Sequence, residues 1–178
     1  MKRFNIPFSP PDMTEAEVKE VAEAILSGWI TTGPRTKELE RQIAAYIGTN
    51  KAVCLNSQTA CAEMALRLLG IGAGDEVIVP AYTYTASASI VCHVGATLVF
   101  ADVQSNSLEM DYAQVEQLIT PRTKAIIPVD LAGIPCDYER LLQIVEKKRS
   151  IYLPANNIQQ ALGRIAICAD AAHAFGAS

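Results

Sequence analysis

From residue 52 onward, short apolar runs alternate with segments of helical length, and this alternation restricts the fold more than any other feature. Each run is bounded by turn-forming residues, as expected for the buried strands of a parallel sheet. The runs interpreted as strands are 52–55, 76–80, 97–103, 124–131 and 165–169. The helices predicted between them cover about 59–69, about 84–94, a segment capped by Asp111, and 137–148. Such a succession of right-handed βαβ units predicts an α/β fold with a three-layer, doubly wound, mostly parallel sheet.

The first fifty residues follow a different pattern. Residues 1–13 are Pro-rich and predicted to be extended. Thr14 and Glu17 form the pattern of a capping box, which predicts a helix from there to Gly28. A second amphipathic helix is predicted from about Thr36 to Gly48, with an inward face of Leu39, Ile43, Tyr46 and Ile47.

Residues 149–164 form a connection longer than is usual between a helix and a strand, and we interpret them as an insertion with a short helix near 157–162. The expected organisation is therefore an arm with two helices over residues 1–50 and a large domain over residues 51–178, which contains the insertion.

Composition and charge exclude several classes of protein. The 178 residues are 50% hydrophobic and 19% charged, below the roughly 25% that is usual for charged residues, which favours a surface covered by a partner subunit or by further chain. A net charge of −4 without a basic stripe argues against nucleic-acid binding. No apolar run approaches the ~20 residues of a membrane helix and no signal peptide is apparent, so we expect a cytoplasmic protein without membrane partners. The five cysteines show no metal-ligand spacing and are predicted to be small buried side chains.

The last strand leads into an acidic residue and a histidine. Asp170 follows the apolar run 165–169, at the strand end where ligands of parallel sheets bind, and His173 comes three residues later. A carboxylate buried there needs a partner, and a cationic ring nitrogen would serve. The alternative is that Asp170 is only a helix cap and that His173 only packs.

Two earlier stretches would meet Asp170 at the same edge of the sheet. The turn NSQTA, residues 56–60, opens a buried helix, whose N-terminus can bind an anion, although its residues are also ordinary caps. Tyr82 and Tyr84 follow the second strand, where an aromatic ring can either stack on a flat cofactor or pack. An anion site, an aromatic ring and an acid together predict a flat, phosphorylated, nitrogen-containing ligand, most simply pyridoxal phosphate (PLP). The glycines of residues 70–76 end a helix instead of opening one, so a nicotinamide-binding domain is disfavoured.

Five motifs in order support a family resemblance. GWITTGP, NSQTA, GDEVIVPAYTYTASA, TPRTKAIIPV and DAAHAFG resemble the DegT/StrS family of PLP-dependent aminotransferases, from about residue 8 to the end apart from 149–164. The family aminates nucleotide-linked keto-sugars, often with glutamate as donor, in polysaccharide and cell-surface sugar biosynthesis. The resemblance implies the large domain of the aspartate aminotransferase-like (fold type I) enzymes and a homodimer with shared active sites.

The same resemblance implies roles for seven residues. Gln58 and Thr59 would hold the cofactor phosphate, Tyr84 would stack on its ring, and Asp170 would pair with the pyridine nitrogen. His173 would lie near the phenolic oxygen, as the catalytic residue within this chain. Thr32 and Gly33 lie in the loop that the family places near the substrate. No metal is implied.

Two departures from the family matter. Asp130 stands where the family often has His, so no role is assigned to it. The lysine that forms the Schiff base lies beyond DAAHA in the family, and none of the seven lysines here matches its position. The C-terminal domain of the family is also absent, so we expect the chain to dimerise or aggregate and to be inactive by itself, with PLP either bound or absent. The alternatives are a sugar dehydratase of the same family, in which His replaces that Lys, and a non-catalytic or regulatory product.

Overall fold

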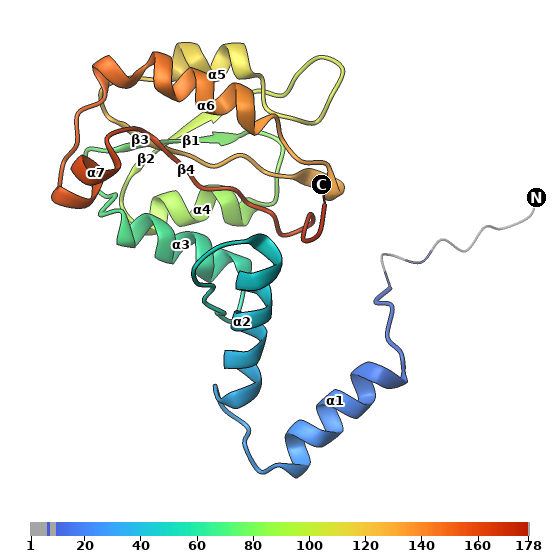
Figure 1. The fold of residues 1–178 in the computed structure, drawn as a ribbon. Coiled ribbons are helices and arrows are strands. Elements are labelled where there is room, and N and C mark those ends of the chain that lie inside the picture. The colour runs from blue at the N-terminus through green and yellow to red at the C-terminus, as the bar shows by residue number, and fades with distance from the viewer. Residues whose placement is uncertain (1–6, 8–9, 178) are drawn as a thin grey trace, which may run out of the picture. The chain divides into compact units, whose positions relative to one another are not determined.

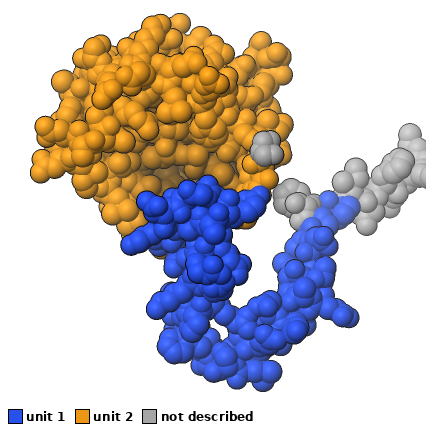
Figure 2. Space-filling model, viewed as in Figure 1, with its two compact units in different colours: residues 1–54 blue, residues 55–178 orange. Residues whose placement is uncertain are grey.

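The chain divides into two compact units, Met1–Cys54 and Leu55–Ser178, called here the helical unit and the sheet unit (Figure 2). The computed structural model describes residue 7 and residues 10–177. Most of the segment predicted to be extended, residues 1–13, therefore lies outside the described residues.

Two helices form the helical unit. α1 (Glu15–Leu26) begins with the predicted capping box, in which Thr14 accepts from the Ala16 N–H and Glu17 accepts from the Thr14 N–H. α2 (Pro34–Ile47) starts two residues earlier than predicted, because Pro34 occupies the first turn, where a missing N–H costs nothing. It ends as predicted at Gly48, whose φ of 77° lies in the left-handed region that suits glycine.

The apolar faces of these helices are exposed. Ala44 is the only buried residue of α1 and α2. The prediction of an inward face is wrong for Leu39, Tyr46 and Ile47, which are all exposed. The reason is that the helical unit contains no sheet or further helix layer that could cover these side chains.

The sheet unit contains a parallel sheet in the order β2-β1-β3-β4 (Figure 1). Its strands are β1 (Glu76–Pro80), β2 (Thr97–Ala101), β3 (Thr123–Ile126) and β4 (Ala166–Ile167), and every pairing is parallel. The helices between them are α4 (Thr85–His93), α5 (Tyr112–Leu118), α6 (Tyr138–Lys147) and α7 (Asn157–Leu162), preceded by α3 (Gln58–Leu68). The predicted α/β fold class is confirmed.

Helices cover both faces of this sheet. α5 and α6 lie on one face, and α3 and α4 lie on the other (Figure 1). Side chains of β1 alternate between the two resulting cores: Ile78 packs with α5 and α6, whereas Val77 and Val79 pack with α3 and α4. All five residues of β1 are therefore buried, which explains why its sequence is apolar without alternation.

The sheet has four strands in the described residues, not the predicted five. Residues 52–55 form no strand, because they have no hydrogen-bonded neighbour; the Cys54 N–H donates to Glu40 Oε1 over 2.9 Å instead. The predicted strand 124–131 ends at Ile126, and beyond it only Val129 forms a parallel bridge, with Asp170.

The segment 149–164 contains a short 3-10 turn, Arg149–Ile151, and the predicted short helix, α7. Asn156 caps α7, and its Nδ2 donates to the carbonyl of Leu69 over 3.1 Å. The buried Gln159 donates to the same carbonyl over 3.0 Å. The segment thus docks on the end of α3 through side-chain amides.

The five cysteines are free, and their predicted burial is wrong for two of them. Cys136 is buried, Cys54 and Cys168 are half-buried, and Cys61 and Cys92 are exposed on helices. Apolar neighbours in the sequence do not bury a cysteine on the outer side of an amphipathic helix.

Candidate functional site

A pocket lies in the sheet unit at the carboxyl end of the parallel strands, the edge where α/β proteins bind ligands. It has a volume of about 100 Å³. Its walls come from the start of α3, from the segments after β1 and β3, and from the segment after β4. The lining residues are Gln58, Thr83, Tyr84, Ala86, Val129, Leu131, Asp170, Ala172 and His173.

The backbone of Asp170 is fixed at this edge. Its N–H donates to the Pro128 carbonyl over 2.8 Å, and its own carbonyl accepts from the Asp130 N–H over 3.0 Å. These bonds continue the β3–β4 pairing beyond the strands themselves. Asp170 therefore lies three residues beyond β4, which is shorter than the predicted strand 165–169, and it forms a parallel bridge with Val129 at the carboxyl edge of the sheet.

The carboxylate of Asp170 is buried and bonded to neutral donors. Its side chain is 5% exposed. Ser87 Oγ donates to Oδ2 over 2.8 Å, and the Ala172 N–H donates to Oδ1 over 3.3 Å. Thr83 and Ser87 share a further hydroxyl bond of 3.2 Å. A buried carboxylate with only neutral partners within the described residues would be stabilised by a cation in the pocket.

Ser87 and Thr83 are the site residues that sequence reasoning missed. Ser87 is 1% exposed although it lies on α4, among Ala, Ile and Val. The signal in the sequence was a serine in the first turn of a largely apolar helix, with a second hydroxyl residue, Thr83, just before the helix N-cap Tyr84.

His173 also lines the pocket, and its ring is oriented by the loop after β3. Its Nδ1 accepts from the Ala132 N–H over 3.3 Å. An accepting Nδ1 leaves Nε2 as the protonated nitrogen of the neutral ring. His173 and Asp170 therefore line the same pocket. The Nε2–H of His173 is on the side of its ring that faces away from the loop after β3.

The start of α3 contributes Gln58 to the same pocket. Ser57 caps this helix by accepting from the Ala60 N–H over 3.1 Å. Gln58 is the first helical residue and lines the pocket, whereas Thr59 is half-buried beside it and is absent from the pocket lining. The positive end of the α3 dipole thus faces the same edge as Asp170.

Of the two tyrosines after β1, Tyr84 lines the pocket and Tyr82 does not. Tyr84 precedes α4, lines the pocket and is 78% exposed, so the face of its ring is free for contact. Tyr82 is also exposed but does not line the pocket.

Thr32 and Gly33 belong to the helical unit, where Trp29 organises their loop. Trp29 Nε1 donates to the carbonyl of Thr32 over 3.2 Å, and the indole ring fills the space that a side chain at Gly33 would need. A separate cavity of about 260 Å³ lies along this loop and is lined by Trp29, Gly33 and Pro34, among others. The Trp thus acts as a local anchor.

The pocket fits one wall of a PLP site. Its volume of about 100 Å³ is below the roughly 300–1,000 Å³ of complete ligand pockets, so these residues enclose part of a ligand. A helix N-terminus, an exposed aromatic ring and a buried acid are the partners that a phosphate, a flat ring and a protonated ring nitrogen require. Among the described residues, no group of three or more His, Cys, Asp or Glu could hold a metal ion. None of the described helices is both long and apolar enough to span a bilayer.

Comparison with known proteins places the chain in a family. Residues 11–178 match the model of the DegT/DnrJ/EryC1/StrS aminotransferase family. The chain is 41% identical over 141 residues to the spore coat polysaccharide biosynthesis protein SpsC of Bacillus subtilis, covering 79% of this chain and 36% of that protein. It is 39% identical over 171 residues to the UDP-4-amino-4-deoxy-L-arabinose–oxoglutarate aminotransferase of Shewanella sediminis, covering 96% of this chain and 40% of that protein. The chain thus spans less than half the length of these relatives.

Solved structures show the same relationship. The putative sugar aminotransferase Spr1654 of Streptococcus pneumoniae, in its apo-form, is 60% identical with a TM-score of 0.94, over 97% of this chain and 44% of that one. The same protein is also known in PLP- and PMP-forms. A GDP-4-keto-6-deoxymannose-3-dehydratase is 27% identical with a TM-score of 0.74, over 79% of this chain and 38% of that one. The fold is part of the aspartate aminotransferase-like fold of type I PLP enzymes. The chain belongs to the DegT/DnrJ/EryC1/StrS aminotransferase family.

Proposed function

We propose that this chain is the cofactor-binding part of a PLP-dependent aminotransferase that aminates a nucleotide-linked keto-sugar. Glutamate or a similar amino acid is the proposed donor, and surface-polysaccharide biosynthesis in the cytoplasm is the proposed setting. Sequence identity favours this reaction over the dehydratase alternative, since it is 60% with a sugar aminotransferase and 27% with a sugar dehydratase.

The observation that carries the proposal is the state of Asp170. Its carboxylate is 5% exposed, borders a pocket, and has hydroxyl and amide donors as its described partners. Such a group gains most from a cationic N–H, which is what a protonated pyridine nitrogen offers. The bonds from Ser87 and Ala172 fix the carboxylate, so it needs no reorganisation on binding.

The other residues have complementary proposed roles. Bound PLP supplies an electron sink for the substrate carbanion. Asp170 holds the proton on the ring nitrogen, while Gln58 and Thr59 at the start of α3 bind the phosphate. Tyr84 covers one face of the ring, and His173 directs its Nε2–H toward the phenolic oxygen. Thr32 and Gly33 are proposed to approach the substrate.

The described lysines of the sheet unit do not line the pocket. Lys124 lies at the start of β3, and Lys147 and Lys148 lie at the end of α6, so all three are at the amino end of the strands. We therefore propose that the reactive lysine is supplied by chain outside these 178 residues, that the site is completed in a homodimer, and that the chain alone does not transaminate.

The first test measures PLP binding to the 178-residue chain by equilibrium dialysis. We expect saturable binding of one PLP per chain, with inorganic phosphate as a competitor because both use the start of α3. Absence of saturable binding, or binding that is insensitive to phosphate, would contradict the proposed site.

The second test concerns catalysis. After incubation with one equivalent of PLP and then sodium borohydride, mass spectrometry should find no lysine that carries the cofactor in preference to the other exposed lysines. Incubation with PLP, glutamate and a nucleotide-linked keto-sugar should give no amino-sugar above background. A cofactor fixed preferentially at one lysine, or an amino-sugar product, would show that a lysine of this chain is sufficient.

A further inference from the structure

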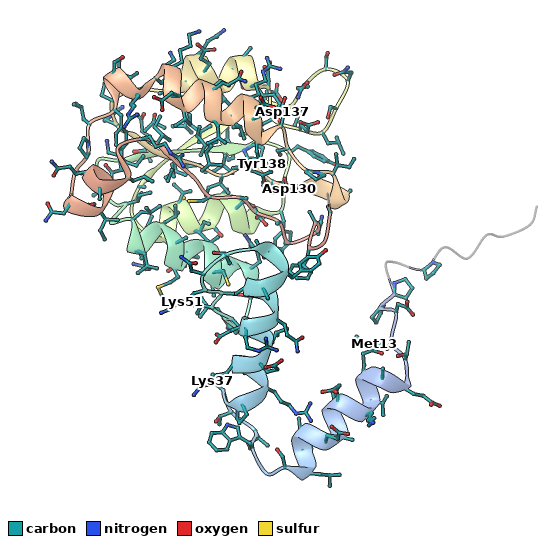
Figure 3. All side chains as sticks on the ribbon, in the orientation of Figure 1. Met13, Lys37, Lys51, Asp130, Asp137 and Tyr138 are labelled. Carbon is teal, nitrogen blue, oxygen red and sulfur yellow. The ribbon has the colours of Figure 1, made fainter. Side chains whose placement is uncertain are left out.

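A second buried acid, Asp130, lies next to the site. Its side chain is 5% exposed. Tyr138 Oη donates to its Oδ1 over 2.8 Å, and the Cys136 N–H donates to the same oxygen over 2.9 Å. Asp130 and Tyr138 lie in one region of the sheet unit (Figure 3). The donors come from the far end of the loop between β3 and α6, so the carboxylate ties the two ends of this loop together.

The donors of this cluster stay protonated near neutral pH. Burial, reinforced by the Asp130 carboxylate, raises the pKa of the Cys136 thiol to about 12. Burial and the bond to Asp130 also raise the pKa of Tyr138. The Cys136 Sγ–H donates in turn to the Val129 carbonyl over 3.2 Å. The loop from 129 to 138 is thus closed by three bonds that converge near Asp130.

The closed loop carries the only non-glycine residue with a positive φ in the described chain. Ala132 has φ 55° and ψ 26°, a conformation that the surrounding structure must enforce. In this conformation its N–H donates to His173 Nδ1. The next residue, Gly133, has φ 81°, and a Cβ there would lie 3.3 Å from the His173 carbonyl oxygen.

We propose that Asp130 is a positioning residue that holds the 131–134 turn in shape, so that the Ala132 N–H fixes the ring of His173. This proposal rests on the proposed function only where it assumes that His173 contacts bound PLP. Asp130 does not line the pocket itself and acts through the turn. The Asp130 side chain thus supports the turn behind the histidine, whereas Ser87 supports the carboxylate of Asp170.

The test uses the two histidines as an internal pair. His93 Nδ1 lies 2.9 Å from Glu63 Oε2, so it donates, whereas His173 Nδ1 accepts. Nitrogen-15 NMR of histidine-labelled chain without PLP, at mildly alkaline pH, should therefore show opposite tautomers for the two rings. The variant Asp130→Ala should bring the two His173 nitrogen shifts closer together, through tautomer averaging, and leave those of His93 unchanged.

Conservative variants separate positioning from folding. Asp130→Asn keeps an acceptor oxygen and should restore the wild-type His173 shifts. Tyr138→Phe removes one donor and should move the shifts part of the way, which keeps the test available if Asp130→Ala does not fold. Tyr152→Phe is the matched control, because Tyr152 Oη has no hydrogen-bond partner among the described residues.

Unchanged His173 shifts in folded Asp130→Ala and in Tyr138→Phe would overturn the proposal. So would equal losses in Asp130→Asn and Asp130→Ala. Because these spectra need no cofactor, they remain decisive even if PLP binding fails, and a failure of the NMR test leaves the PLP assignment intact.

Discussion

Buried acids have different bonding partners at the two ends of the parallel sheet. At the amino end, Glu76 is 4% exposed and is bonded by Arg122 and by the hydroxyl of Thr120. At the carboxyl end, Asp130 and Asp170 are each 5% exposed, and neither forms an ion pair within the described chain.

This difference suggests different roles for the buried acids at the two ends: stability at the amino end and ligand binding at the carboxyl end. A buried charge is costly unless it is paired, and the amino end satisfies Glu76 with a cation from the same chain. The carboxyl end holds its acids with neutral donors and thereby keeps a negative site for an external cation. Removing Glu76 at the amino end should therefore lower the free energy of unfolding. Removing the charge of Asp170 at the carboxyl end should lower the affinity for the ligand.

The largest expected effect is on cofactor affinity in Asp170→Asn. The amide keeps an acceptor for Ser87 but loses the charge, so we expect PLP affinity to fall about 10- to 150-fold, the equivalent of a charge-assisted bond of about 1.5–3 kcal/mol. Equilibrium dialysis measures the affinity, and urea unfolding should show little change in stability. Asp111→Asn is the control, since Asn caps α5 as well as Asp does. Unchanged affinity would break the comparison.

At the other end, Glu76→Ala should have the opposite profile. It removes the acceptor of Arg122 and Thr120, so we expect the free energy of unfolding to fall by about 1–2 kcal/mol with unchanged PLP affinity. Glu116→Ala, which breaks the ion pair of a half-buried glutamate with the exposed Lys147, should destabilise the chain less than Glu76→Ala does. The comparison fails if Glu76→Ala weakens PLP binding more than it destabilises the chain.

The sequence predicts the carboxyl end better than the helical unit. Asp170, His173 and Tyr84 lie in one pocket because parallel strands bring the residues after them to one edge, a rule that needs only strand order. Gln58 lines the same pocket from the start of α3, although the strand predicted before it is not formed. The prediction of a strand at residues 52–55 was wrong. An apolar run forms a strand only when a second strand pairs with it through hydrogen bonds, and the sequence of the run does not show whether such a partner is present.

The supports behind the site could not be predicted from strand order. Ser87 reaches Asp170 across 83 positions of sequence, and Tyr138 reaches Asp130 only because the loop between them folds back. Such contacts depend on side-chain direction at loop ends, where hydrophobic periodicity carries no information. Inward burial of the apolar face of α2 was mispredicted for a related reason, since an apolar stripe on a helix does not identify the layer that covers it.

A smaller effect is expected for Ser87→Ala. It removes one hydrogen bond to Asp170 and leaves the buried carboxylate with the Ala172 N–H, so we expect about 1 kcal/mol of lost stability. PLP affinity should change by less than about 10-fold, because the charge remains. The matched control is Ser89→Ala, because within the described part of the chain the Ser89 hydroxyl donates to the Ala86 carbonyl of its own helix. Equal unfolding midpoints for the two variants would show that Ser87 does not support Asp170.

The smallest effect concerns Lys124 at the amino end, and it appears as a pH dependence. Its side chain is 4% exposed; Nζ donates to the Pro121 carbonyl over 2.8 Å and lies 4.0 Å from Asp75 Oδ1. Burial lowers the pKa of Lys124 below its ordinary value of 10.5, although Asp75 and Glu76 oppose the shift. Between the lowered pKa and 10.5, the unfolded chain holds a proton that the folded chain has released, so stability contributed by this residue rises with pH.

The variant Lys124→Met isolates this contribution. It fills a similar space without a charge, so its stability should lack the rise. The difference between wild type and variant should grow in favour of wild type as the pH rises from the lowered pKa of Lys124 towards 10.5. Because Lys124 Nζ lies 5.5 Å from the centre of the Tyr152 ring, whose pKa burial raises, both proteins are compared in a Tyr152→Phe background. Urea unfolding at a series of pH values measures it. A flat difference would mean that Lys124 is as well solvated in the folded chain as in the unfolded one, and the amino end would then not be the dry, internally paired region that the comparison requires.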